Sequence, residues 1–184
     1  ALMNPPYGAR RRMPSDVTDY VEEQYKYGPE YYINFFEVCE RVSKQNGRVG
    51  MIVQRSFMYK SSFQDFREDF LGELGVFDFL AEYGNGVLDN ATVRTAGTVV
   101  RTDTSTNNEA AGTFYRLHDL SSKEKESGFL EVAFGSANSI DIQREYRKEL
   151  GEFSLIPTTP LSYWASLTTR EMYDSETIFE ERRG

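Results

Sequence analysis

The sequence predicts an α/β fold built around a mostly parallel sheet. Segments in which apolar residues recur at helical spacing alternate along the chain with short runs rich in valine, isoleucine and threonine. This order of helix and strand is typical of a sheet with helices packed on it. The chain has 184 residues, 39% of them hydrophobic, which is enough to form one buried core.

The first third of the chain supplies the clearest elements. Residues 1–3 read as the end of a strand, and an acidic, aromatic stretch from Pro14 is broken at Gly28 and Pro29. A helix is expected from Glu30, ending at Asn46-Gly47, with one apolar face formed by Tyr32, Phe35, Phe36, Cys39 and Val42. Residues 48–53 then predict a buried strand.

The remaining elements follow from similar signals. Ser61 and Ser62 are candidate N-caps of a helix with Phe63, Phe66, Phe70 and Leu71 on one face. Strands are expected over 76–80 and 92–101, then a hairpin loop over 103–112 and a returning strand over 113–117. The last segments read as a charged helical turn over 121–127, a helix over 140–150, a linker between Pro157 and Pro160, and a helix from Ser166.

Composition narrows the function classes. No apolar run approaches the roughly 20 residues that span a bilayer, and no signal peptide is readable, so a cytoplasmic setting without membrane contact is expected. One cysteine and one histidine leave no zinc constellation, so no metal is expected. The net charge of −8 argues against a free-standing DNA-binding protein, which is usually basic. Either a basic surface lies elsewhere in a longer polypeptide, or the source favours acidic surfaces.

One motif carries chemistry: Asn4-Pro5-Pro6-Tyr7, directly after the first strand. The Asn4 side-chain oxygen and the Pro5 carbonyl are two acceptors on a backbone that the paired prolines hold rigid. Together they could accept both hydrogens of an exocyclic amino group such as N6 of adenine, which would move electron density onto that nitrogen. Tyr7 offers a flat face for stacking a base taken out of the duplex. The alternative is a Pro-Pro turn followed by a surface tyrosine.

Beyond this motif, almost the whole chain resembles the N6-adenine DNA methyltransferases, closest to the phage-growth-limitation (BREX) type and to restriction-modification methylases. The resemblance includes the strand Gly47–Val53, the pair Ser56-Phe57, and Phe63 followed by Arg67. It continues in residues 86–93 and 95–101, which resemble the family's sixth-strand region and seventh strand, and in residues 153–164. It implies a Rossmann-like methyltransferase fold, represented here by the C-terminal half of its sheet with flanking helices, plus a C-terminal extension.

The resemblance also assigns site residues. Asn4, Pro5, Pro6 and Tyr7 match the catalytic motif, and Phe63 matches an aromatic residue that stacks on the flipped adenine opposite Tyr7. Phe57 is a second candidate for that stacking role, and a core position is the alternative for Phe63. Two departures stand out: Gln54-Arg55 replaces a proline after the strand, and Thr158-Thr159 replaces Gly-Ser between two prolines, which loses the freedom of glycine.

The methyl donor of this family is S-adenosylmethionine, whose site needs a Gly-rich turn between a strand and a helix. No such motif precedes Asn4, and Tyr83–Gly86 reads as a turn between strands. We therefore expect a fragment, inactive alone and unable to bind the donor. Residues 1–102 would be the target-base half of the catalytic domain, and residues 103–184 a loop, the end of the fold and an extension toward a target-recognition region.

The implied function is transfer of a methyl group to adenine N6 in double-stranded DNA, in a restriction-modification or phage-defence system with possible restriction or defence-system subunits. Two alternatives remain open. One is a methyltransferase acting on glutamine side chains of proteins or on adenine in RNA, because the same motif occurs there. The other is a catalytically dead module that binds DNA or protein.

Other candidate residues have simpler interpretations. His118 is expected to be structural or solvent-exposed, and Cys39 to lie in the core. The acidic residues near Asp16 read as a solvated helix face. Tyr163-Trp164 could contact bases, although anchoring a packed corner is the more common role of such a pair.

Overall fold

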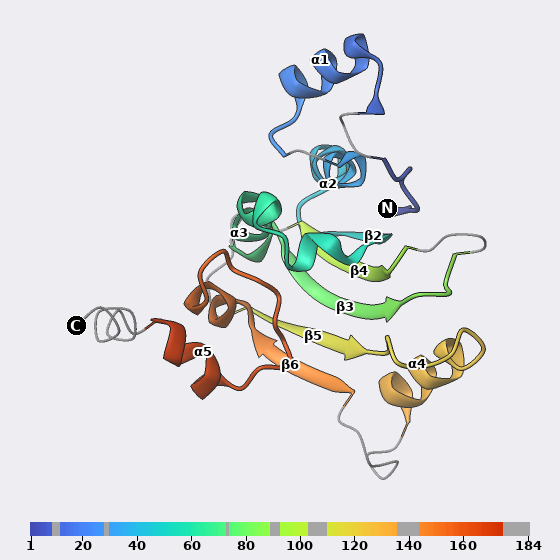
Figure 1. The fold of residues 1–184 in the computed structure, drawn as a ribbon, viewed down its shortest axis with the longest axis vertical. Coiled ribbons are helices and arrows are strands. Elements are labelled where there is room, and N and C mark those ends of the chain that lie inside the picture. The colour runs from blue at the N-terminus through green and yellow to red at the C-terminus, as the bar shows by residue number, and fades with distance from the viewer. Residues whose placement is uncertain are drawn as a thin grey trace.

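The computed structural model describes residues 1–8, 12–27, 30–72, 74–88, 93–102, 110–135 and 144–174. The six described strands form one sheet in the order β1-β2-β4-β3-β5-β6 (Figure 1). In chain order they are β1 (Leu2–Met3), β2 (Gly47–Gln54), β3 (Val76–Gly84), β4 (Thr95–Thr102), β5 (Ala111–Arg116) and β6 (Glu145–Glu149). The sheet and its helices confirm the predicted α/β class.

The sheet is mixed, which corrects the expectation of a mostly parallel one. Two pairs, β1 with β2 and β3 with β5, are parallel, while β2–β4, β4–β3 and β5–β6 are antiparallel. Parallel neighbours need a crossover of about a dozen residues or more. Only residues 85–94 join β3 to β4, and this short link permits antiparallel pairing.

One face of the sheet carries the core. Two helices, α2 (Tyr31–Val42) and α3 (Gln64–Gly72), lie on this face with the short 3-10 helices η2 (Arg55–Met58) and η3 (Ser61–Phe63), and η4 (Leu150–Leu155) closes it from the C-terminal side. Alternate residues of β2 point into this layer, where Val49, Met51 and Val53 are buried. The result is an aromatic core formed largely by Phe36, Phe57, Phe66, Phe70, Phe77, Phe114 and Phe153.

The opposite face is covered at one end by α4 (Lys125–Phe134), whose Phe129 stacks on Phe79 and meets Tyr115 edge-on. Helix α1 (Ser15–Gln24) lies away from the sheet beyond α2, whereas α5 (Leu167–Asp174) lies at the side of the sheet near β6 and contacts η4 (Figure 1). No helix in the described ranges has both the length and the apolar character needed to cross a membrane.

Several local predictions were wrong. The helix expected over 140–150 is instead strand β6 over Glu145–Glu149, followed by η4 from Leu150, because these mostly charged residues pair with β5 at the edge of the sheet. The returning strand after residue 110 pairs in parallel with β3 instead of forming a hairpin with β4. Residues 103–109, the centre of the expected hairpin loop, lie outside the described residues.

Two boundaries also shift. The sixth-strand region expected at 86–93 lies instead at β3, and the described part of 86–93 is the bend that follows it. Helix α2 ends at Val42, and Asn46, with a positive φ of 60°, forms the turn into β2. The proposed division at residue 102 falls between two strands of the same sheet, since β5 and β6 continue it.

Candidate functional site

The Asn4–Tyr7 loop leaves the carboxyl end of β1, beside the carboxyl end of β2. Parallel pairing sets Leu2 opposite Gly50 and Met3 opposite Met51, and the Gly50 amide donates to the Ala1 carbonyl at 2.8 Å. In doubly wound sheets, ligands bind at this edge. The position of the motif therefore agrees with the one inferred from the sequence.

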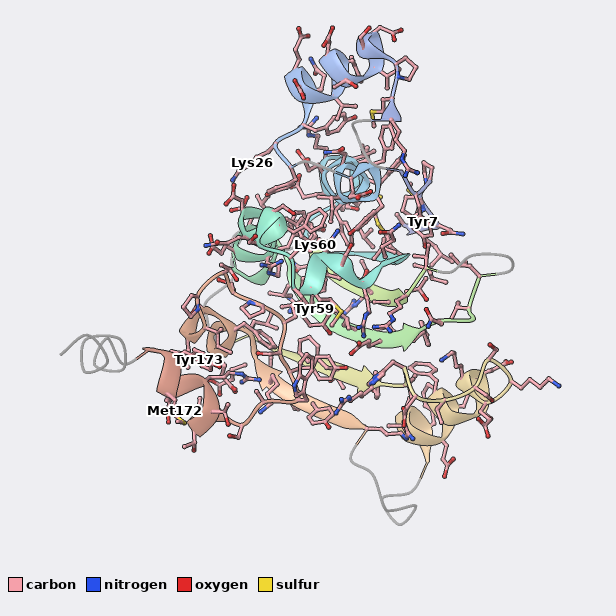
Figure 2. All side chains as sticks on the ribbon, viewed as in Figure 1. Tyr7, Lys26, Tyr59, Lys60, Met172 and Tyr173 are labelled. Atoms are coloured by element: carbon pink, nitrogen blue, oxygen red, sulfur yellow. The ribbon has the colours of Figure 1, made fainter. Side chains whose placement is uncertain are left out.

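The Tyr7 side chain is held by a hydrogen bond from its hydroxyl and by a contact of its ring. Its hydroxyl donates to the Ile52 carbonyl at 3.0 Å, and its ring meets the edge of Tyr32 with the centroids 6.2 Å apart. Burial raises the pKa of Tyr7 above its ordinary value, so the phenol stays neutral. The half-buried ring is thus oriented from β2 and α2 at the edge of the sheet (Figure 2).

Asn4 and Pro5 leave acceptors available. The Asn4 side chain is exposed, and its Oδ1 atom lies 3.4 Å from the Tyr7 hydroxyl, whose single hydrogen has the closer acceptor at Ile52. No donor in the described part of the chain reaches the Pro5 carbonyl. Pro5 itself is buried, which holds the backbone of the loop. The loop can therefore accept two hydrogen bonds from a ligand.

The two predicted stacking residues lie in the core. Phe63 is 1% exposed, and the Tyr32 ring, which meets Tyr7, also contacts Phe63 with a centroid distance of 6.0 Å. Phe57 is fully buried and stacks on Phe77 at 6.0 Å. The structure thus brings Asn4, Pro5 and Tyr7 together and places Phe63 and Phe57 behind them.

Tyr32 is the residue next to Tyr7 whose place at the site the sequence did not reveal. It is fully buried, and its hydroxyl hydrogen-bonds the Ser56 hydroxyl at 2.9 Å. Its helical spacing identified it as an apolar position of α2, which is correct. Its contact with Tyr7 depends on how α2 packs over β1 and β2, and no local signal reports that packing.

Behind this edge, a buried arginine ties the chain to its C-terminal corner. The Arg67 guanidinium donates to the carbonyls of Phe57, Lys60, Thr158 and Thr159, the last at 2.7 Å. Burial lowers its pKa to about 10, which leaves it charged at neutral pH. Thr158 and Thr159 have positive φ values of 68° and 51°, at the positions where the resembling family has Gly-Ser.

The other candidates are placed as follows. Cys39 is buried in the core as expected. Tyr163 is buried and stacks on Phe114 at 5.3 Å, whereas Trp164 is 41% exposed. His118 is half-buried, and burial followed by the charge of Arg116 lowers its pKa, so the ring is neutral at pH 7. Among the described residues, no three or more of His, Cys, Asp and Glu gather where a metal ion could sit.

The turn Tyr83–Gly86 does not fit the Gly-rich motif that binds S-adenosylmethionine. This turn follows β3, which pairs antiparallel with β4, and no helix is described between the two strands. A Cβ atom on Gly86 would lie 2.1 Å from the Ser122 Oγ atom, so this glycine makes room for the protein's own chain rather than for a ligand. A donor site must be formed by other residues.

Comparison with known proteins finds methyltransferases. The family model described as Eco57I restriction-modification methylase matches residues 2–80. The adenine-specific methyltransferase PglX of Lacticaseibacillus casei (strain Zhang) is 29% identical over 197 residues, which cover 100% of this chain and 16% of that protein. The adenine-specific methyltransferase BrxX of Escherichia coli O9:H4 (strain HS) is 24% identical over 170 residues, covering 90% and 13%.

A solved structure of a type I restriction-modification system superposes with a TM-score of 0.61 at 14% identity, covering 99% of this chain and 39% of that one. At this identity the likeness establishes the fold alone. The chain spans about a sixth of the length of the curated relatives. It is related, as its Asn-Pro-Pro-Tyr motif predicted, to the N6-adenine methyltransferases of the restriction-modification and phage-growth-limitation type.

Proposed function

We propose that the Asn4–Tyr7 loop holds the exocyclic amino group of a DNA adenine while it is methylated at N6. The observation that carries the proposal is a pair of acceptors at the carboxyl edge of the sheet: the exposed Asn4 Oδ1 atom, which has only a long 3.4 Å contact with the Tyr7 hydroxyl, and the Pro5 carbonyl, which no donor in the described part of the chain reaches. An adenine amino group has two hydrogens to donate, and two fixed acceptors match them. As both hydrogens are held, electron density moves onto the nitrogen that attacks the methyl group.

The arrangement is preorganised for this role. The hydrogen bond from the Tyr7 hydroxyl to Ile52 and the two prolines in the middle of the motif fix the acceptors before the base arrives. Acceptors that need no reorganisation favour the transition state, in which the hydrogens carry more positive charge than in the ground state. The side chain of Asn4 is therefore the proposed polarising group, and Tyr7 the proposed stacking face.

The family model and the names of the relatives support a role in a restriction-modification or phage-defence system. We propose double-stranded DNA as the substrate, S-adenosylmethionine as the donor, held by residues outside those described, and the cytoplasm as the location. Other subunits of a restriction or defence system are the proposed partners.

The proposal is tested by incubating the complete protein that carries this chain with labelled S-adenosylmethionine and host DNA. The expected product is N6-methyladenine, identified by mass spectrometry after digestion to nucleosides. Transfer RNA and a glutamine-containing protein extract are the parallel substrates. Label in either of these, with none in DNA, would assign another substrate class. No transfer to any of the three, despite measurable donor binding, would support a catalytically dead module.

A further inference from the structure

A cavity of about 570 Å³ opens at the same edge of the sheet as the Asn4–Tyr7 loop, and nothing above uses it. Its walls come from the carboxyl ends of β2, β3 and β5 and from the start of β4. Its charged and aromatic lining includes Arg55, Arg94, Arg116, Glu82, Tyr59 and Trp164.

The charge of this pocket is opposite to that of the chain. Three guanidinium groups face one carboxylate in a protein of net charge −8. Arg55 forms an ion pair with the buried Glu82, which also accepts a hydrogen bond from Tyr163. Arg94 and Arg116 form no ion pair in the described part of the chain, so two guanidinium groups remain for an anionic ligand.

An aromatic surface borders these arginines. Trp164 is 41% exposed, with its ring 5.8 Å from that of Tyr59 and 5.1 Å from that of the buried Tyr163. The Arg116 guanidinium lies over the indole at 5.7 Å. A braced but exposed indole beside free guanidinium groups is the combination that binds a nucleic acid backbone together with a neighbouring base.

A buried acceptor is also left open. The Nδ1 atom of His118 has no hydrogen-bond partner among the described residues. Next to it, the turn after β3 is held close, since a Cβ atom on Gly84 would lie 2.9 Å from His118 Cβ. Gly84 and His118 therefore form a closely packed part of the pocket wall, and Arg116 and Trp164 line the same pocket.

The distance between the pocket and Asn4 determines how long a ligand must be to reach both sites. β4 is two strands and β5 four strands from β1 in the sheet order. At about 4.8 Å per strand, Arg94 and Arg116 lie roughly 10 and 19 Å from the motif. Along one DNA strand, at about 3.4 Å per nucleotide, this corresponds to roughly three to six nucleotides.

We propose that Arg94 and Arg116 each bind a phosphodiester group of the target DNA, roughly three to six nucleotides from the methylated adenine, with Trp164 packed against an adjoining nucleoside. The inference rests on the proposed function, because it takes the ligand at the Asn4–Tyr7 loop to be DNA. It assigns a positioning surface, distinct from the residues that contact the reacting amino group.

The test uses the complete protein and Arg94→Gln, Arg116→Gln and the double variant. Arg147→Gln is the matched control, since Arg147 is exposed on β6 and makes no ion pair among the described residues. Binding of a fluorescent duplex is measured by anisotropy between about 50 and 200 mM salt. The slope of log K against log salt is negative. Each pocket variant is expected to reduce its magnitude by about 1 and the double variant by about 2, with no change for the control.

Trp164 supplies an independent signal, because it is the single tryptophan of the 184 residues. The fluorescence of wild type minus that of Trp164→Phe reports this indole alone. Duplex DNA is expected to quench it, and ATP at equal phosphate concentration is expected not to. Quenching by ATP with none by DNA would overturn the proposal in favour of a free nucleotide.

Failure of this inference can be told from failure of the proposed function. If the wild type methylates DNA but both pocket variants keep its salt slope and affinity, the pocket proposal alone is wrong. If the wild type neither binds nor methylates DNA, the proposed function is wrong and the pocket proposal with it.

Discussion

Two segments of this protein rely on proline, and they differ in what holds them: strand pairing and a tyrosine hydroxyl in one, a buried arginine in the other. The Asn4–Tyr7 loop is fixed by its neighbours in the sheet and by its own residues, through the Tyr7 hydroxyl bond to Ile52. The corner at 156–160 is fixed from a distance, because Arg67 holds the carbonyls of Thr158 and Thr159. The first segment can be interpreted from four adjacent residues. The second makes sense only together with a side chain about ninety residues earlier.

The largest effect is expected from Arg67→Met, which removes the distant support of the corner. Arg67 is fully buried, and its loss leaves four carbonyls without their charged donor. Each buried carbonyl left without a hydrogen-bond donor costs about 1–3 kcal/mol, so the total loss is several kcal/mol. In a domain of this size that lowers the melting temperature by roughly 10 °C, measured by circular dichroism.

Arg48→Met is the control, because the Arg48 side chain is 65% exposed and its ion pair with Asp78 lies at the surface. Exposed pairs contribute about 1 kcal/mol or less. Equal melting temperatures for Arg67→Met and Arg48→Met would show that the corner is stable without its distant clamp.

The next largest effect concerns the Asn4–Tyr7 loop. Asn4→Ala should lower kcat on duplex DNA by about 10²-fold or more, because the lost acceptor acts mainly in the transition state. Donor affinity and melting temperature should stay unchanged, since the Asn4 side chain is exposed. Single-turnover methylation and calorimetric titration measure both. Turnover within a few-fold of wild type would refute the role assigned to Asn4.

The same contrast explains what could be predicted from sequence. The Asn4–Tyr7 motif, β2 and α2 follow from short-range signals: paired prolines, an apolar run and helical spacing. The strand β6 was predicted as a helix because its charged residues have no apolar period to oppose that assignment, and only pairing with β5 makes it extended. The contacts of Tyr32 with Tyr7 and Phe63, and the pocket lined by Arg94, Arg116 and Trp164, depend on strand order, which no local pattern encodes.

A third prediction tests which of the contacting rings Tyr7, Tyr32 and Phe63 stacks on the base and which only packs in the core. Base–aromatic stacking is worth roughly 1–3 kcal/mol, so Tyr7→Ala should weaken capture of an extruded adenine by about 5- to 100-fold. The loss should shrink for a mispaired adenine, which costs less to flip. Fluorescence of 2-aminopurine at the target position reports flipping.

For Phe63, the stacking role implied by the family resemblance stays a prediction, and its burial favours packing. Phe63→Leu keeps the site apolar, so a packing role predicts a lower melting temperature with unchanged 2-aminopurine fluorescence. Reduced flipping of paired adenine at an unchanged melting temperature would instead assign Phe63 to the base slot.

The smallest effect tests whether the corner is strained. Thr158 has a φ of 68°, a conformation that costs a β-branched residue about 1–2 kcal/mol relative to glycine. Glycine gives back part of this gain by losing more backbone entropy on folding, about 0.5–1 kcal/mol. We therefore expect Thr158→Gly to stabilise the protein by about 0.5–1 kcal/mol and raise the melting temperature by roughly 2 °C. Thr168→Gly in α5 is the matched control with the opposite sign, because glycine inside a helix is unfavourable by up to about 1 kcal/mol. If Thr158→Gly lowers the melting temperature as Thr168→Gly does, the hydrogen bonds from Arg67 do more than hold a strained backbone, and the threonine side chain itself must stabilise the corner.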